Sequence, residues 1–195
     1  MTVGSYEARV AALARLAAEG TQAGLPRVRA GLADSEALVR VAALEAIVEL
    51  AAVDEETRTA VEKLVQDPDE LVRAYAGWAL ARMGDPRAAA VLAAGLPGEP
   101  SAVARAGMLE GLVRLEPDPR WLSALLSLLG DSDPEARAFV SNSLVGVASR
   151  ENVQRLVADL EAARDAETFP AIREVLESNL RTLRDMAADG DFELD

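Results

Sequence analysis

The chain has 195 residues, of which 33 are acidic and 20 basic, so its formal net charge at neutral pH is -13. This charge opposes binding to nucleic acid and to anionic membranes, and we expect neither as a partner. Cys and His are both absent, which excludes disulfides, thiolate chemistry and metal sites built on these residues. We therefore expect no catalytic residue, no metal site and no cofactor.

The first ten residues lack the basic and apolar regions of a signal peptide, and the longest uncharged runs fall short of the roughly 18 apolar residues that a membrane helix needs. We expect a cytoplasmic protein with one domain.

In chain order, the sequence predicts five helix pairs followed by one longer helix. Turn residues such as Gly20 and the run Gly84, Asp85, Pro86 separate the predicted helices. The predicted repeats cover about residues 1–33, 34–66, 67–98, 99–130 and 131–164, with a capping helix over 165–188 and an acidic, disordered tail over 189–195. Phe192 and Leu194 in this tail could instead dock on another protein as a short motif.

A regularly spaced arginine supports this division. Its steps along the chain are 31, 33, 32, 32 and 36 residues, at Arg9, Arg40, Arg73, Arg105, Arg137 and Arg173. Five of the six follow an acid by six residues, the acids being Asp34, Asp67, Glu99, Asp131 and Glu167. A fixed period above thirty residues with helical content is typical of an α-solenoid. We expect each acid to cap a helix, and each Arg to stack on the adjacent repeat and to pair with a neighbouring acid.

Residues 67–96 and 131–148 carry a more specific pattern. The first run begins with acids, continues through Val-Arg into an Ala-rich helix and contains Gly-Asp-Pro-Arg. In these features the chain resembles HEAT repeats of the phycobilisome-lyase-like class over about residues 34–164. The resemblance implies an all-α solenoid in a right-handed superhelix, with the second helix of each pair on the concave side. Its function is left open, because the class includes bilin lyase subunits, metal hydroxylases and adaptor proteins.

The first helices of the pairs, aligned on the repeated Arg, share an apolar stripe that we assign to the seam between repeats. The stripe comprises Val39, Ala43, Ile47, Leu50, Val72, Ala76, Leu80, Met83, Ala104, Met108, Leu112, Leu115, Ala136, Val140, Leu144 and Val147.

An outward stripe on the same helices contains Tyr75, Trp78 and Arg82, where other repeats carry mostly small or polar residues. These three residues form a candidate partner site on the convex face. The alternative is that the aromatic rings cover gaps between Ala-rich helices.

The second helices give a candidate site on the concave face. There Trp121 stands alone among non-aromatic residues at its aligned position, which Asn152 occupies in the next repeat. Arg87 and Arg120 lie at the aligned helix entrances. An aromatic ring with guanidinium groups suits an acidic or carboxylate-bearing peptide. Alternatively, Trp121 fills the gap above the small Ala88.

These features favour a non-catalytic adaptor or scaffold that binds another protein. The alternative from the resemblance is a subunit of a bilin lyase or isomerase, although the chain lacks His and Cys for such chemistry and has fewer repeats than such a lyase would be expected to have. Iron hydroxylases of this class use His-Glu pairs, which the absence of His excludes.

Overall fold

The computed structural model describes residues 5–52, 54–116 and 118–192. This part of the chain forms eleven α-helices and three short 3-10 helices, without a strand. The elements are α1 (Tyr6–Glu19), η1 (Gln22–Gly24), α2 (Leu25–Gly31), α3 (Ala37–Glu49), α4 (Glu55–Leu64), α5 (Glu70–Arg82), α6 (Arg87–Gly95), η2 (Leu96–Gly98), α7 (Ala102–Leu115), α8 (Pro119–Ser127), η3 (Leu128–Gly130), α9 (Pro134–Gly146), α10 (Val153–Ala166) and α11 (Pro170–Asp189). The predicted all-α solenoid is confirmed.

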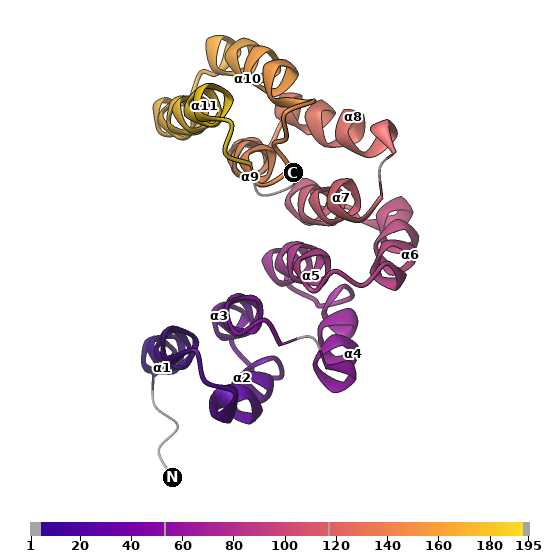
Figure 1. Cartoon of the computed structure of the whole chain (residues 1–195), viewed down its shortest axis with the longest axis vertical. Coiled ribbons are helices and arrows are strands. Elements are labelled where there is room, and N and C mark those ends of the chain that lie inside the picture. The colour runs from indigo at the N-terminus through magenta and orange to yellow at the C-terminus, as the bar shows by residue number, and fades with distance from the viewer. Residues whose placement is uncertain (1–4, 53, 117, 193–195) are drawn as a thin grey trace.

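The helices form a curved row of pairs (Figure 1). The odd-numbered helices pack directly on one another along the inner side of the curve, and the even-numbered helices lie along the outer side. The resemblance predicted the opposite, with the second helices on the concave side. That prediction is wrong: α5, which carries Tyr75, Trp78 and Arg82, belongs to the inner row, and α6 and α8, which carry Arg87, Arg120 and Trp121, belong to the outer row.

Small residues explain why the row bends towards the odd-numbered helices. A Cβ atom added to Gly107 of α7 would lie 2.3 Å from the carbonyl oxygen of Ala74 on α5, and one added to Gly77 would lie 2.8 Å from the carbonyl oxygen of Gly107. The two helices therefore touch through their backbones. Consecutive even-numbered helices approach one another nowhere as extensively in the described part of the chain. The side with the shorter helix spacing becomes the inner side.

The core has two main clusters that meet near α7. One is built from α1 to α7 and the other from α7 to α11, and Leu96 and Trp121 pack against both. The predicted seam positions are buried, apart from Met83 and Leu115, which are half-buried. The burial supports the assignment of this stripe to the contact between repeats.

The repeated arginines join each repeat to the next. Arg73 shows the pattern: its Nε and Nη2 donate to the carboxylate of Glu99 at 2.7 and 2.8 Å, and its Nη1 donates to the carbonyl of Asp67 at 2.8 Å. The other cross-repeat pairs are Arg9 with Asp34, Arg40 with Asp67, Arg105 with Asp131 and Arg137 with Glu167. We call these five pairs the arginine ladder. The predicted pairing of the repeated arginines with a neighbouring acid is confirmed for these five.

The ladder acids were expected to cap the helices, but they bind amides in the turn that precedes each helix. Asp67 Oδ1 accepts from the amide of Asp69 at 2.9 Å, and Asp69 is the residue whose own carboxylate receives the amides of Leu71 and Val72 in the first turn of α5. Glu99 and Asp131 likewise accept from the residue two positions later. These three ladder acids thus hold the turn, and the side chain two positions later, of Asp69, Ser101 or Asp133, caps the helix.

The chain remains ordered beyond α11 as far as it is described. Gly190 ends the helix in the left-handed conformation, and its carbonyl accepts from Arg150 Nη2 at 3.1 Å. Phe192 is half-buried against the second core cluster. The start of the predicted disordered tail is therefore structured, because Asp189 belongs to the helix and Phe192 has apolar surface to cover, while Leu194 lies outside the described residues.

Replacing Gly107 with Ala should destabilise the fold by about 2 kcal/mol, although the same change in a helix with free space stabilises it by about 1 kcal/mol. The new methyl group cannot fit against the backbone of α5. Urea unfolding measures the effect. Gly98→Ala is the control, because a Cβ there meets nothing within 4 Å. Equal stability of the two variants would contradict backbone contact between α5 and α7.

The ladder predicts a specific loss of stability in acid. The guanidinium of Arg137 lowers the pKa of Glu167 from 4.5 to about 2. Because the folded pKa lies below the unfolded one, this pair stabilises the fold fully above about pH 4.5 and loses its effect as the pH falls towards about 2. Glu167→Gln should cost about 2 kcal/mol at neutral pH and flatten the pH profile across that window, as read by thermal unfolding. Asp165→Asn, at an exposed acid nearby, should leave both unchanged.

Candidate functional site

The inner face carries a hollow of about 310 Å³ in the middle of the solenoid. It is formed by side chains of α3, α5, α7 and α9. We call it the aromatic hollow, and its lining residues are Glu45, Tyr75, Trp78, Arg82, Glu110, Phe139, Asn142, Ser143 and Gly146. The structure thus brings the three predicted residues of the outward stripe into one concave site.

Three aromatic side chains, all half-buried, form the apolar part of this hollow. The Tyr75 ring lies edge-on to Trp78, with centroids 5.8 Å apart, and edge-on to Phe139, with centroids 6.1 Å apart. The guanidinium of Arg82 lies 5.9 Å from the Trp78 ring centroid. Such edge-to-face pairs hold the rings in place and leave part of their faces uncovered.

A glycine makes this arrangement possible. Tyr75 and Phe139 occupy the same position in repeats that are not adjacent, and Gly107 occupies it in the repeat between them. Since Gly107 has no side chain and α7 lies in backbone contact with α5, the two rings meet across α7. Gly107 belongs to the outward stripe by its spacing from Arg105, yet it is buried because of this backbone contact.

Polar groups surround the rings. Glu110, which occupies on α7 the same position as Trp78 on α5, is only 5% exposed, whereas Glu45 is exposed at the rim of the hollow. Burial raises the pKa of Glu45, and the nearby Glu49 raises it further. Burial likewise raises the pKa of the Tyr75 hydroxyl, with smaller effects from Glu45 and Glu110. The hydroxyl of Ser143 is buried and makes no hydrogen bond within the described part of the chain.

The side chains of the candidate site on the second helices are less available to a partner, because most of them already contact other parts of the protein. Arg120 stacks over Trp121, with its guanidinium carbon 4.2 Å from the ring centroid, and pairs with Asp118 at 2.9 Å. Trp121 is half-buried, and its Nε1 donates to Glu116 at 2.9 Å. Because Trp121 also packs against both core clusters, it fills the junction between the two halves.

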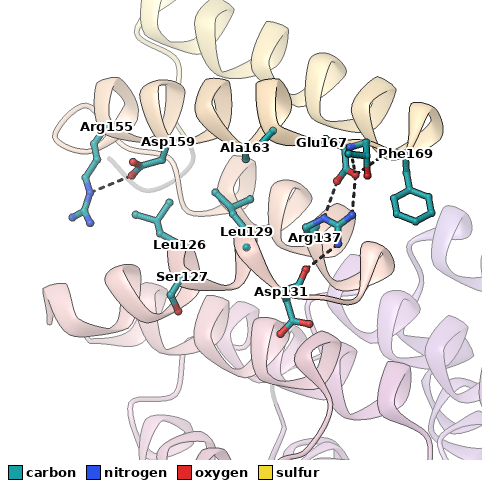
Figure 2. Close-up of a pocket in the computed structure, with 13 residues that line it drawn as sticks. Leu126, Ser127, Leu129, Asp131, Arg137, Arg155, Asp159, Ala163, Glu167 and Phe169 are labelled. Atoms are coloured by element: carbon teal, nitrogen blue, oxygen red, sulfur yellow. Dashed lines mark hydrogen bonds and ion pairs between the residues drawn. The ribbon is translucent and has the colours of Figure 1, made fainter.

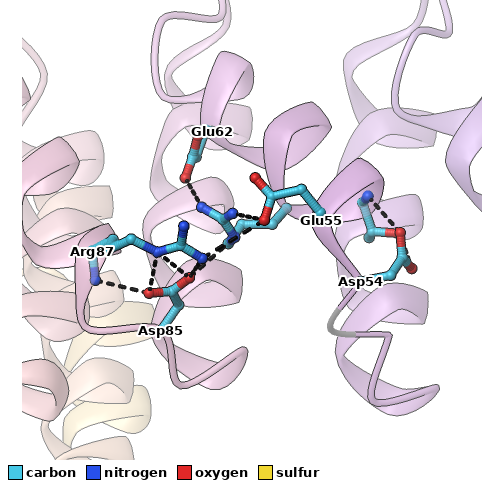
Figure 3. A network of polar contacts seen from close by, with 7 residues as sticks. Asp54, Glu55, Glu62, Asp85 and Arg87 are labelled. Carbon is cyan, nitrogen blue, oxygen red and sulfur yellow. Dashed lines mark hydrogen bonds and ion pairs between the residues drawn. The ribbon is translucent and has the colours of Figure 1, made fainter.

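Arg87 belongs to a separate network on the outer side (Figure 3). It donates to Asp85 at 2.6 Å, and this contact lowers the pKa of Asp85 to about 2. The buried Arg58 joins Asp85 to Glu55 and Glu62 of α4. The charge of Arg87 is therefore compensated within the protein.

Asn152 also has a local role. Its Nδ2 donates to the carbonyl of Val147 at 2.9 Å, and its Oδ1 accepts from the amide of Ser149 at 2.9 Å. Asn152 thus shapes the turn before α10. The structure does not assemble Arg87, Arg120, Trp121 and Asn152 into one cluster, because each is held by neighbours in its own turn.

A larger hollow of about 660 Å³ runs along α10, between this helix and the end of α8 with η3 (Figure 2). Its charged groups pair with one another: Arg137 with Glu167 at 2.7 Å, and Arg155 with Asp159 at 3.5 Å. Phe169 at its edge is 52% exposed. This hollow surrounds the Arg137–Glu167 pair of the arginine ladder. It lacks the convergent aromatic rings of the inner face.

Comparison with known proteins agrees with this architecture. Residues 25–113 match the family model of HEAT repeats. This stretch consists of HEAT repeats. Its resemblance to this repeat class, first suggested by the turn and helix patterns, is confirmed.

A solved structure extends the comparison over almost the whole chain. The complex of CpcE and CpcF of phycocyanin lyase from Nostoc sp. PCC7120 is similar with a TM-score of 0.62 at 15% sequence identity, covering 94% of this chain and 76% of that chain. This likeness concerns the fold of the HEAT-repeat array. No curated protein matches the sequence. None of the helices in the described ranges is long and apolar enough to span a membrane.

The aromatic hollow also includes Phe139, Glu110 and Ser143, which the sequence alone did not select. Phe139 and Glu110 stand in the same outward stripe as Tyr75 and Trp78, which is the signal that could have found them. Ser143 does not belong to that stripe, and its place depends on how α9 turns towards the hollow.

Trp121→Ala should destabilise the protein by about 2 to 4 kcal/mol, because it removes a ring that packs against both core clusters. Arg120→Ala should cost less than about 1 kcal/mol, since it removes an exposed ion pair and a stacking contact. Chemical denaturation of both variants measures the difference. A Trp121→Ala variant as stable as wild type would mean that the ring is not structural.

Proposed function

We propose that this HEAT-repeat chain is a non-catalytic scaffold that binds another protein on its inner face, with the aromatic hollow at the centre of the contact. The observation that carries the proposal is the set of half-buried rings of Tyr75, Trp78 and Phe139 around one concave site. Aromatic residues in fixed, partly desolvated positions are typical centres of binding energy at protein interfaces.

The helices behind the hollow support this role. Tyr75 and Trp78 lie on α5, whose backbone touches α7, and both rings pack against the first core cluster. A partner would therefore bind rings that are already held in position, and little conformational entropy would be lost on binding.

Binding of an acidic or carboxylate-bearing peptide near Trp121 is a less supported proposal. Arg87 and Arg120 pair with Asp85 and Asp118, at 2.6 and 2.9 Å. An acidic peptide would have to displace these internal carboxylates before it could use either guanidinium, and exchange of one exposed ion pair for another yields little free energy.

The alternative function is that of a subunit in an enzyme resembling phycocyanin lyase. The similar solved structure is a complex of two lyase proteins, which favours a second protein chain as partner under this alternative as well. The aromatic hollow, at about 310 Å³, is at the lower end of the roughly 300–1,000 Å³ of drug-sized ligand sites, so it suits a side chain better than a whole tetrapyrrole.

A pull-down from the source organism's lysate tests the proposal. A specific partner should be retained by wild type and by Arg87→Ala, and should be reduced about tenfold or more by Trp78→Ala, because a central aromatic residue contributes roughly 2 kcal/mol or more. Mass spectrometry identifies the bound proteins.

Unfolding curves of the same variants serve as the control, since a loss of binding counts only if Trp78→Ala remains folded. Loss of the partner with Trp121→Ala or Arg87→Ala, and not with Trp78→Ala, would contradict the proposal and favour the outer face. Visible tetrapyrrole absorption in the eluate would make the lyase alternative the better one.

A further inference from the structure

We propose that the aromatic hollow takes an arginine side chain from a basic segment of the partner protein. This inference rests on the proposed function and specifies the chemistry of the contact. The aromatic rings, an uncompensated carboxylate and a buried hydroxyl without a partner converge on one concave site.

The first support is the uncompensated charge of Glu45. Glu45 lines the hollow, and Glu49 lies one helical turn further along α3. Within the described residues, neither carboxylate makes an ion pair with a basic side chain, in contrast to the ladder acids. Burial and Glu49 raise the pKa of Glu45. A bound cation would relieve this unfavourable placement.

The second support is the aromatic surface. Ring faces attract cations, and a guanidinium can stack flat on a ring while its N–H groups remain directed outward. The protein already has three arginine–aromatic contacts: Arg120 lies 4.2 Å from the centroid of Trp121, Arg137 lies 5.8 Å from that of Phe169, and Arg82 lies 5.9 Å from that of Trp78. The net charge of -13 would attract a basic segment over longer distances.

The third support is the hydrogen-bonding capacity of the hollow. Ser143 is 3% exposed, lines the hollow and has no hydrogen-bond partner in the described structure. Asn142 lines the same space, and its Oδ1 accepts from Asn179 Nδ2 at 2.7 Å. A guanidinium offers five N–H donors to the oxygen atoms that line the hollow, whereas a group with a single donor can serve only one of them.

The test is a titration followed through the two tryptophan indole N–H signals in NMR spectra. The probes are the acetylated and amidated tripeptide Gly-Arg-Gly and its analogue with citrulline, which has nearly the shape of arginine and no charge. The arginine peptide should shift the Trp78 signal and leave Trp121 unchanged, and the shift should weaken at high salt. Citrulline should have little effect. No shift of Trp78, or equal shifts with both peptides, would overturn the proposal.

A matched pair of variants sharpens the test. Glu45→Gln should weaken binding of the arginine peptide by about fivefold, the effect expected for one partly exposed charge. Glu151→Gln removes an equal charge at an exposed position in the turn before α10, outside the lining of the hollow, and should have no effect. Equal effects of the two substitutions would mean that the peptide is attracted only by the overall charge of the protein, and would contradict a specific site.

The pull-down separates this inference from the proposed function. A natural partner that requires Trp78 but binds equally well to Glu45→Gln, at low and high salt, would sustain the proposed function and reject the arginine. A partner that depends only on Trp121 would reject the proposed function, whatever the peptide does.

Discussion

The arginine ladder is the interaction on which the repeating structure depends. Each of its arginines donates to a carboxylate of the next repeat, and four of them also donate to a backbone carbonyl of their own repeat, as Arg73 does with Glu99 and Asp67. Glu99 in turn accepts the amide of Ser101, which caps α7. One charged pair thereby couples the start of one helix to the start of the next. The apolar seam supplies most of the buried surface, whereas the ladder specifies how far along the helices each repeat sits on its neighbour.

Much of this organisation could be predicted from the sequence because it recurs. The same spacing of seam residues, ladder partners and helix boundaries recurs in several repeats. The pattern can therefore be recognised even where one repeat departs from it. The direction of curvature could not be predicted this way. It depends on how closely α5 approaches α7, which Gly77 and Gly107 determine, and each glycine alone could equally have marked a weak point in a helix.

The candidate site was predicted only in part for a related reason. Tyr75, Trp78 and Arg82 stood out as aromatic or basic residues in an otherwise bland stripe, and the structure unites them. Trp121 stood out by the same criterion, yet it fills the junction between two core clusters. An unusual residue in a repeat indicates a local departure from regularity. Whether such a residue serves packing or binding depends on its neighbours in space, such as Glu116, which accepts a hydrogen bond from the indole N–H of Trp121.

The gap at Gly107 has a consequence for how this array could change. Tyr75 and Phe139 meet only because the repeat between them contributes no side chain at that position. Repeats of equal length and equal stability are thus not interchangeable here. Duplication or loss of one repeat could preserve the ladder and the seam while it separates the two rings or fills the space between them. The number and order of repeats are therefore constrained in the centre of the solenoid more than at its ends.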